Sequence, residues 1–289
     1  MRTPGNPSGN DEAVTGSGRN FRVMKLRKDP GTGGRRDDMA TMQCSFLSNV
    51  LGMVTELTVI VPDEKEWGNT GRYPVIYLLH GLTDGQDSWL QRTALARYCE
   101  EYRIAAVMPG AARSFYTDMA YGMDYFTFIS EEVPSFCEAM FPIGGCPEKR
   151  FIAGNSMGGY GAVKTALKKP GMYAKAAAFS GVMDINSMMQ AFPELEKDWI
   201  CCFGGNEAPQ EEDLFFLTGR AQENGTLMPI YQYCGTGDFL YRDNLRFLEY
   251  CRERQIPVTY RDEEGGTHDW VFWDDRLPKI IKWFLDMED

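Results

Sequence analysis

The feature that most constrains the fold is an alternation of short apolar segments with amphipathic segments, which begins at residue 39. The strand-like segments span residues 54–61, 74–79, 104–108, 150–153, 174–179, 229–233 and 258–261. The helix-like segments span residues 88–101, 124–140, 157–168, 211–223, 244–254 and 269–287, and Pro278 is expected to interrupt or restart the last one. Residues 54–61 alternate like an antiparallel edge strand, whereas the later strands are continuous apolar runs typical of strands buried on both faces.

Repeating strand–helix units favour an α/β fold with a mainly parallel central sheet and helices on both faces. Neither an internal repeat nor a Pro/Gly/Ser-rich linker follows Met39, so residues 39–289 are predicted to form a single domain. The longest irregular interval, residues 180–225, has two interpretations. It holds peripheral helices packed on the core, or it forms a cap or pocket wall, as long loops in compact domains often do.

Residues 1–38 differ from the rest of the chain in composition. They carry a net charge of +3, only seven of them are hydrophobic, and they contain no Trp or Tyr. Such a segment buries too little apolar area to offset its ordering entropy, so it is predicted to be a disordered basic leader. Our hypothesis is that this leader is a non-native extension and that Met39 is the natural start.

The charge balance excludes several classes of function. The chain has 30 Lys+Arg against 41 Asp+Glu, a net charge of −11, and residues 39–289 alone carry −14. A nucleic-acid surface or a site for anionic lipid needs clustered Lys and Arg, so neither partner is expected. No apolar run reaches the roughly 18 residues of a membrane span, and no secretory signal is recognisable. The eight cysteines are then interpreted as reduced thiols of a cytoplasmic protein.

The sequence Gly154-Asn155-Ser156-Met157-Gly158-Gly159 joins a predicted strand to a predicted helix. This context is that of a nucleophile elbow, in which small residues flank a serine on a sharp turn and its hydroxyl projects outward. The helix that follows aims backbone N–H groups at the site. The alternative is a glycine-rich turn with an exposed serine. We predict Ser156 as the nucleophile.

The general base follows from the histidine count. A serine hydroxyl needs a base, and the chain has only two histidines, His80 and His268. Chain order with this elbow is serine, acid, histidine, so His268 is the predicted base. His80 ends a predicted strand and is expected to orient or pack rather than to act as a base.

The acid must lie between Ser156 and His268 and hold the imidazole in the correct tautomer. Asp238 is preferred because it lies on a glycine-containing turn after a predicted strand, although a helix N-cap is its other interpretation. Asp184 is the second choice, and Asp198 and Asp213 are weaker ones.

Two backbone N–H donors are needed for the oxyanion, and the loop after a His-Gly strand end supplies one of them in this arrangement. We assign the donors to Leu82 and Met157. No metal or cofactor site is predicted, because the cysteines form no C-x-x-C pair and no phosphate loop or dinucleotide fingerprint appears.

With these motifs in place, the chain resembles the esterase D-like family of α/β-hydrolases, closest to its bacterial tributyrin-esterase branch. The group includes tributyrin esterases, S-formylglutathione hydrolases, and feruloyl and acetylxylan esterases. The matching segments, besides the elbow, are Met42-Gln43-Cys44-Ser45-Phe46, Leu51-Gly52-Met53, Val61-Pro62, Leu79-His80-Gly81, Ser88-Trp89, Phe115-Tyr116-Thr117-Asp118, Gly235-Thr236-Gly237-Asp238-Phe239 and His268-Asp269-Trp270.

The resemblance implies an α/β-hydrolase fold, cofactor-free hydrolysis of short acyl esters, and a triad of Ser156, Asp238 and His268. It also implies that Trp89, Tyr116 and Asp118 bind substrate. The expected partner is a small-molecule ester, with feruloyl esters included among the candidates. Thioester hydrolysis, acyl transfer to a sugar or lipid, and a non-catalytic binding protein stay open, as does assembly into a homo-oligomer.

Overall fold

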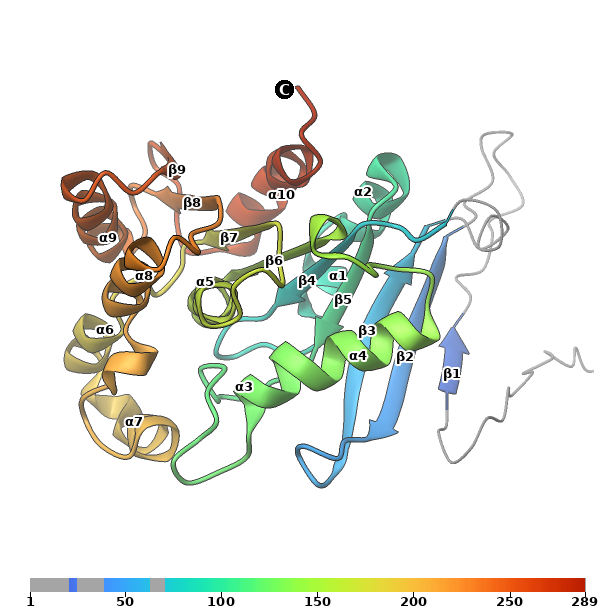
Figure 1. Cartoon of the computed structure of the whole chain (residues 1–289), viewed down its shortest axis with the longest axis horizontal. Coiled ribbons are helices and arrows are strands. Elements are labelled where there is room, and N and C mark those ends of the chain that lie inside the picture. Colours follow the sequence, from blue (N-terminus) through green and yellow to red (C-terminus); the bar gives the residue numbers. More distant parts are fainter. Residues whose placement is uncertain (1–20, 25–38, 63–70, 289) are drawn as a thin grey trace, which may run out of the picture.

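The computed structural model describes residues 21–24, 39–62 and 71–288, and these residues build one twisted sheet covered by helices (Figure 1). The strands described are β1 (Phe21–Met24), β2 (Ala40–Leu47), β3 (Val54–Val61), β4 (Val75–Leu79), β5 (Ala105–Pro109), β6 (Arg150–Asn155), β7 (Lys175–Phe179), β8 (Ile230–Gly235) and β9 (Val258–Glu263). The order in the sheet is β1-β2-β3-β5-β4-β6-β7-β8-β9. Pairs from β5 through β9 are parallel, while β1–β2, β2–β3 and β3–β5 are antiparallel. The predicted mainly parallel α/β-hydrolase sheet is confirmed.

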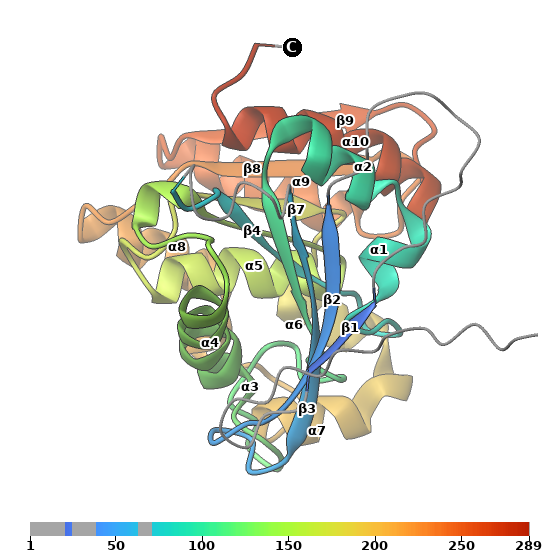
Figure 2. The same cartoon turned by 90° about the vertical axis from the view of Figure 1, so that its right-hand side faces the viewer.

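Helices connect these strands and divide between the two faces of the sheet (Figure 2). They are α1 (Ser88–Arg92), α2 (Leu95–Tyr102), α3 (Tyr125–Thr127), α4 (Val133–Met140), α5 (Met157–Lys168), α6 (Ile185–Ala191), α7 (Glu196–Phe203), α8 (Leu214–Glu223), α9 (Tyr241–Glu253) and α10 (Trp270–Phe284). A π-helical turn at Phe128–Glu132 joins α3 to α4, and short 3₁₀ turns lie at Pro147–Lys149, Pro193–Leu195 and Gln210–Glu212. None of the helices described is long and apolar enough to cross a membrane.

Two apolar clusters form the core, one on each face of the sheet. One joins α4, α5, α8 and α9 to the sheet, and the other joins α1, α2 and α10 to the opposite face. Central strands contribute alternate residues to the two clusters: Tyr77 and Leu79 of β4 face the first, and Ile76 and Leu78 face the second. This two-sided burial explains why the parallel strands are continuous apolar runs.

The antiparallel edge differs from the sequence prediction in two ways. β3 is antiparallel, as predicted, but it is an inner strand because it pairs with both β2 and β5. Four residues of the predicted leader, Phe21–Met24, form β1 and pair with β2. Their partners, Thr41–Cys44, therefore pair with β1 on one side and with β3 on the other. The unpaired backbone N–H and C=O groups of an edge strand can pair with another strand, whatever side chains that second strand carries. The rest of the predicted leader lies outside the described residues.

Two predicted helices also differ in detail. The segment 88–101 is split between α1 and α2, where the Thr93 hydroxyl bonds the Trp89 carbonyl and the Ala94 N–H bonds Asp274. In contrast, α10 continues through Pro278 without a restart. Proline removes one helical hydrogen bond, and the burial of Leu277 and its neighbours against the sheet offsets that loss.

Candidate active site

The turn between β6 and α5 holds Ser156 in an uncommon backbone conformation. Its φ is 55° and its ψ is −119°, a region that a non-glycine residue rarely adopts and that is found at functional sites. The Ser156 N–H donates to the Phe179 carbonyl at the end of β7, which fixes the turn. Strand, sharp turn and helix therefore occur in the predicted order.

Glycines on either side let this turn pack against β4. A Cβ on Gly154 would lie 2.7 Å from the Leu79 carbonyl oxygen, and one on Gly158 would lie 2.8 Å from the His80 carbonyl oxygen. These distances are shorter than real contacts of a Cβ atom, so both positions require glycine. The close approach also brings Gly81 beside the serine, because a Cβ on Gly81 would lie 3.7 Å from the Ser156 Cβ.

Asp238 and His268 come from the loops after β8 and β9 and form a hydrogen-bonded pair. The His268 Nδ1 lies 2.9 Å from one Asp238 carboxylate oxygen and 3.1 Å from the other. The Asp238 side chain is fully buried, and it also accepts from the Leu240 N–H. Asp238 is not the N-cap of α9, because Leu240 occupies that position. A buried carboxylate that accepts from Nδ1–H leaves the other ring nitrogen, Nε2, free to accept a proton.

The other three candidate acids are engaged elsewhere. Asp184 caps α6 through the Ser187 N–H and pairs with Arg246. Asp213 caps α8, and Asp198 forms a two-point ion pair with Arg113. Each of these carboxylates has a structural partner, and none is recorded in contact with His268.

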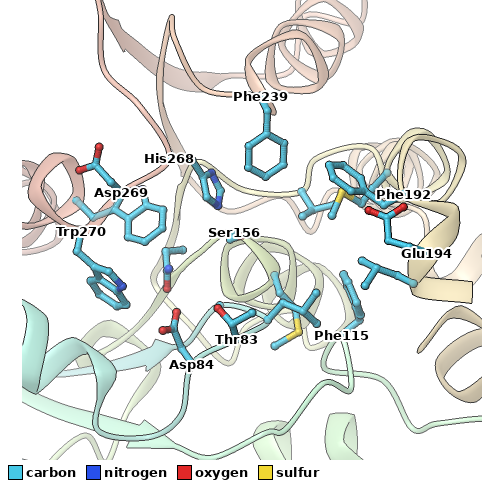
Figure 3. Close-up of a pocket in the computed structure, with 18 residues that line it drawn as sticks. Thr83, Asp84, Phe115, Ser156, Phe192, Glu194, Phe239, His268, Asp269 and Trp270 are labelled. Atoms are coloured by element: carbon cyan, nitrogen blue, oxygen red, sulfur yellow. The ribbon is translucent and has the colours of Figure 1, made fainter. Parts of the chain in front are cut away.

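Ser156 and His268 line the same pocket, which has a volume of about 450 Å³ (Figure 3). The imidazole lies over Ser156 and is packed between two aromatic rings, Phe239 at 4.5 Å and Trp273 at 5.0 Å between centroids. These contacts restrict the rotation of the ring. The structure thus gathers the three predicted triad residues at the carboxyl ends of β6, β8 and β9, where parallel sheets place their sites.

The two predicted oxyanion donors, Leu82 and Met157, also line this pocket. Met157 is the first residue of α5, so its N–H belongs to the helix end that lacks intrahelical partners. His80 supports the neighbouring loop, since its Nε2 accepts from the Ala111 N–H and its Nδ1 lies 2.7 Å from the Gly81 carbonyl oxygen. Burial lowers the pKa of His80, which keeps it neutral. His80 is thus buried and bonded to backbone groups on both sides, as a packing or orienting residue would be.

The three predicted substrate-binding residues lie outside the pocket lining, which corrects that expectation. Trp89 and Tyr116 are completely buried, and their polar atoms bond the carbonyls of Leu79 and His80. Asp118 instead accepts from the N–H and hydroxyl of Thr127. The polar atoms of Trp89 and Tyr116 are therefore already occupied by backbone groups at the end of β4.

Other residues take the place of these three in the pocket wall. Thr83 and Asp84 follow Leu82, Phe115 directly precedes Tyr116, and Phe239 directly follows Asp238. Phe115 and Phe239 both stand inside segments of the sequence that match the family, but only their neighbours were predicted to have a role. The available signal was the aromatic side chain directly beside each of those predicted residues.

Residues 180–225 contain both helices that pack on the core and part of the pocket wall. Trp199, Cys202 and Phe203 of α7 are buried in the core, as peripheral helices would be. Met188 and Phe192, together with residues of the turn Pro193–Leu195, line the pocket and form its wall opposite Trp270 (Figure 3).

The charged groups of the pocket wall are acidic. Asp84, Glu194 and Asp269 line it, and no Lys or Arg is found among its described lining residues. Hydrogen bonds from the Thr267 hydroxyl and the Phe272 N–H lower the pKa of Asp269, so this helix-capping carboxylate stays ionised. Over the part of the chain that the structure describes, no group of three or more His, Cys, Asp or Glu side chains is arranged to hold a metal.

Comparison with known proteins places this geometry in a family. The Esterase family model, described as "Putative esterase", matches residues 48–284. The chain belongs to this esterase family. An acetyl esterase of Caldicellulosiruptor saccharolyticus is 30% identical over 267 residues, which cover 87% of this chain and all of that protein.

Two solved structures from Staphylococcus aureus are similar over their whole length. The fluorophosphonate-binding serine hydrolase FphF has a TM-score of 0.79 and 31% identity, covering 87% of this chain and 99% of that one. An S-formylglutathione hydrolase, FrmB, has a TM-score of 0.77 and 32% identity, with 86% and 99% covered. This member of the esterase family is a carboxylic ester hydrolase with an α/β-hydrolase fold.

Proposed function

We propose that this esterase is a serine carboxylesterase that hydrolyses short-chain acyl or aryl esters through an acyl-enzyme on Ser156. The observation that carries the proposal is the Asp238–His268 pair, with the imidazole directed into the pocket that also contains Ser156. These residues supply the nucleophile, the base and the acid that orients the base. The similarity to a fluorophosphonate-binding serine hydrolase supports a serine nucleophile.

The first half of the proposed reaction acylates the enzyme. The Ser156 Oγ attacks the ester carbonyl carbon while His268 Nε2 takes the hydroxyl proton, and buried Asp238 stabilises the imidazolium. The N–H groups of Leu82 and Met157 bind the oxyanion, each worth on the order of 10²–10³ in rate. When the tetrahedral intermediate collapses, the carbon–oxygen bond to the alcohol breaks, and His268 returns the proton to the leaving oxygen.

The second half regenerates the enzyme. His268 removes a proton from water, whose oxygen attacks the acyl carbon on Ser156. The ester bond to Ser156 breaks, Ser156 regains a proton from His268, and the carboxylic acid leaves. The reaction balances with water as the only co-substrate, so no metal or cofactor enters it.

The acidic pocket wall favours a neutral ester over a glutathione thioester. Asp84, Glu194 and Asp269 line the pocket, and glutathione carries a net negative charge at neutral pH. Like charges at short range raise the cost of binding. We expect kcat/KM for p-nitrophenyl butyrate to exceed that for S-formylglutathione, and the reverse order would favour the thioester function of FrmB. Methyl ferulate belongs in the same substrate panel, because feruloyl esters are also candidate substrates.

The decisive experiment replaces the nucleophile. Ser156→Ala is expected to abolish turnover of p-nitrophenyl acetate and butyrate while the circular dichroism spectrum stays that of the unaltered protein. Ser45→Ala is a matched control, because Ser45 lies on β2, which is separated from β6 in the sheet by β3, β5 and β4. Retained turnover in Ser156→Ala would refute the assignment.

A fluorophosphonate probe gives a second test of the nucleophile, because it should label the unaltered protein and Ser156→Ala should remove the label. We also propose a cytoplasmic location, which agrees with eight free cysteines.

A further inference from the structure

One buried cation lies close to the pocket and takes no part in the proposed chemistry. Lys164 is on α5, about two turns after Ser156, and its side chain is fully shielded from solvent. Its Nζ donates to a Glu212 carboxylate oxygen at 2.5 Å and to the Phe115 carbonyl oxygen at 3.0 Å. It also lies 4.6 Å from the centre of the Tyr160 ring. Burying an ammonium group is costly unless it is paired, so this site needs an explanation.

The carbonyl that Lys164 binds belongs to a strained turn. Phe115 and Tyr116 are consecutive residues with φ of 48° and 55°, the left-handed region that bulky residues rarely occupy. Such conformations persist only where surrounding contacts fix them, and they are concentrated at functional sites. The turn leaves Phe115 on the pocket wall (Figure 3), whereas Tyr116 is completely buried and does not line the pocket.

Two anchors on this turn come from different elements. The Tyr116 hydroxyl donates to the His80 carbonyl oxygen at 2.8 Å, and its ring packs so closely on α5 that a Cβ on Gly161 would lie 2.5 Å from the ring atom Cγ. Lys164 supplies the second anchor, which is a charged one. The Phe115 ring then packs against Trp199 of α7, with centroids 4.9 Å apart. The turn therefore links the nucleophile helix to the pocket wall.

We propose that Lys164 is a positioning residue, which holds the Phe115 carbonyl so that the Phe115 ring keeps the shape of the ester-binding pocket. This inference rests on the proposed esterase function, and Lys164 itself does not touch substrate. Loss of the anchor lets the strained turn relax toward negative φ and moves the ring. The fit of the ester is then lost, while the triad on β6, β8 and β9 stays in place.

A double-mutant cycle tests this role. The four proteins are the unaltered chain, Lys164→Met, Phe115→Ala and the double variant, each standardised by fluorophosphonate titration of active sites. We expect Lys164→Met to raise KM for p-nitrophenyl butyrate about five-fold, to change kcat less than about two-fold, and to have no further effect in the Phe115→Ala background.

Lys168→Met is the matched control. Lys168 lies on the same helix and donates to the other oxygen of Glu212 at 2.6 Å, whereas the donor to the Phe115 carbonyl is Lys164. It is expected to leave KM within about two-fold of the unaltered value. If Lys164→Met does not fold, Lys164→Arg serves in the same cycle, because it keeps the charge and displaces the donor.

Additive effects of the two substitutions, or an equal rise of KM in Lys168→Met, would overturn the positioning role. The proposed function fails separately. It is refuted if the unaltered protein neither turns over the butyrate ester nor binds the fluorophosphonate. An active enzyme with an additive cycle would refute only the role of Lys164.

Discussion

The His268 Nδ1 lies 2.9 Å from a carboxylate oxygen of Asp238, and that carboxylate is shielded completely from solvent. Shielding makes the hydrogen bond directional and stronger than it would be in water. It also leaves the imidazole in one orientation, between Phe239 and Trp273. The activity should therefore depend on the negative charge of Asp238 as well as on its shape.

Asp238→Asn tests this dependence. The amide keeps the size of the side chain but favours the wrong tautomer of His268, so kcat for p-nitrophenyl acetate should fall about 10³–10⁴-fold. Asp184→Asn is the control, because Asp184 caps α6 and pairs with Arg246. A near-normal rate for Asp238→Asn, with a large loss for Asp184→Asn, would move the acid to Asp184.

The nucleophile turn should tolerate no side chain at Gly158. A Cβ there would overlap the Leu79 carbonyl and lie 2.8 Å from the His80 carbonyl oxygen, and backbone atoms cannot move aside as a flexible side chain does. Gly158→Ala should lower the free energy of unfolding by about 3 kcal/mol, measured by urea denaturation. Gly205→Ala, where a Cβ meets nothing within 4 Å, should change it by less than about 0.5 kcal/mol. Equal stability of the two variants would contradict the close packing.

The predictable part of the fold follows from local patterns. The bounds of β3 and α5 match the sequence prediction, because each has a clear periodicity and a turn signal at its ends. The missed strand β2 has polar residues among its buried ones, and its place is fixed by pairing with β3 over eight residues. The continuation of α10 through Pro278 depends on packing that a local rule does not contain.

The candidate site also has a part that could be predicted from the sequence and a part that could not. The grouping of Ser156, Asp238 and His268 could be predicted, since a motif and a count of two histidines select the candidate nucleophile and base. The pocket wall could not, because Phe115 reaches it through a left-handed turn that no periodicity indicates. The sequence also cannot tell an aromatic residue that lines the pocket from one, such as Trp89, that is buried and bonds a backbone carbonyl.

The ring of Phe239 should contribute to catalysis without being a reacting group. It is 55% exposed, yet it lies 4.5 Å from the His268 ring and 5.6 Å from the Phe192 ring of the pocket wall. Such aromatic contacts are worth about 1 kcal/mol, so Phe239→Ala should lower kcat/KM for the butyrate ester about five-fold. Phe216→Ala, on α8 and 37% exposed, should leave it unchanged. An unchanged kcat/KM for Phe239→Ala would show that the imidazole needs no support from this side.

Lys164 should give the stability of the protein a distinctive pH dependence. Burial lowers the pKa of its ammonium group to about 8, although Glu212 opposes that shift. In the unfolded chain the pKa of lysine is about 10.4, so between these values the unfolded chain binds more protons and the free energy of unfolding rises with pH.

The comparison with Lys164→Met isolates this effect, because the groups facing Lys164, namely Glu212, Lys168, Cys202 and Tyr160, remain in both proteins. From about pH 7.5 to about pH 9.5, the unaltered protein should gain about 2 kcal/mol in free energy of unfolding relative to the variant. Between about pH 6 and pH 7, Lys164 is protonated in both the folded and unfolded chains and Glu212, whose pKa Lys164 helps to lower, is still ionised, so the difference between the two proteins should be constant there. Urea denaturation across this range measures both parts. A constant difference at every pH would mean that Lys164 keeps its ordinary pKa in the folded protein.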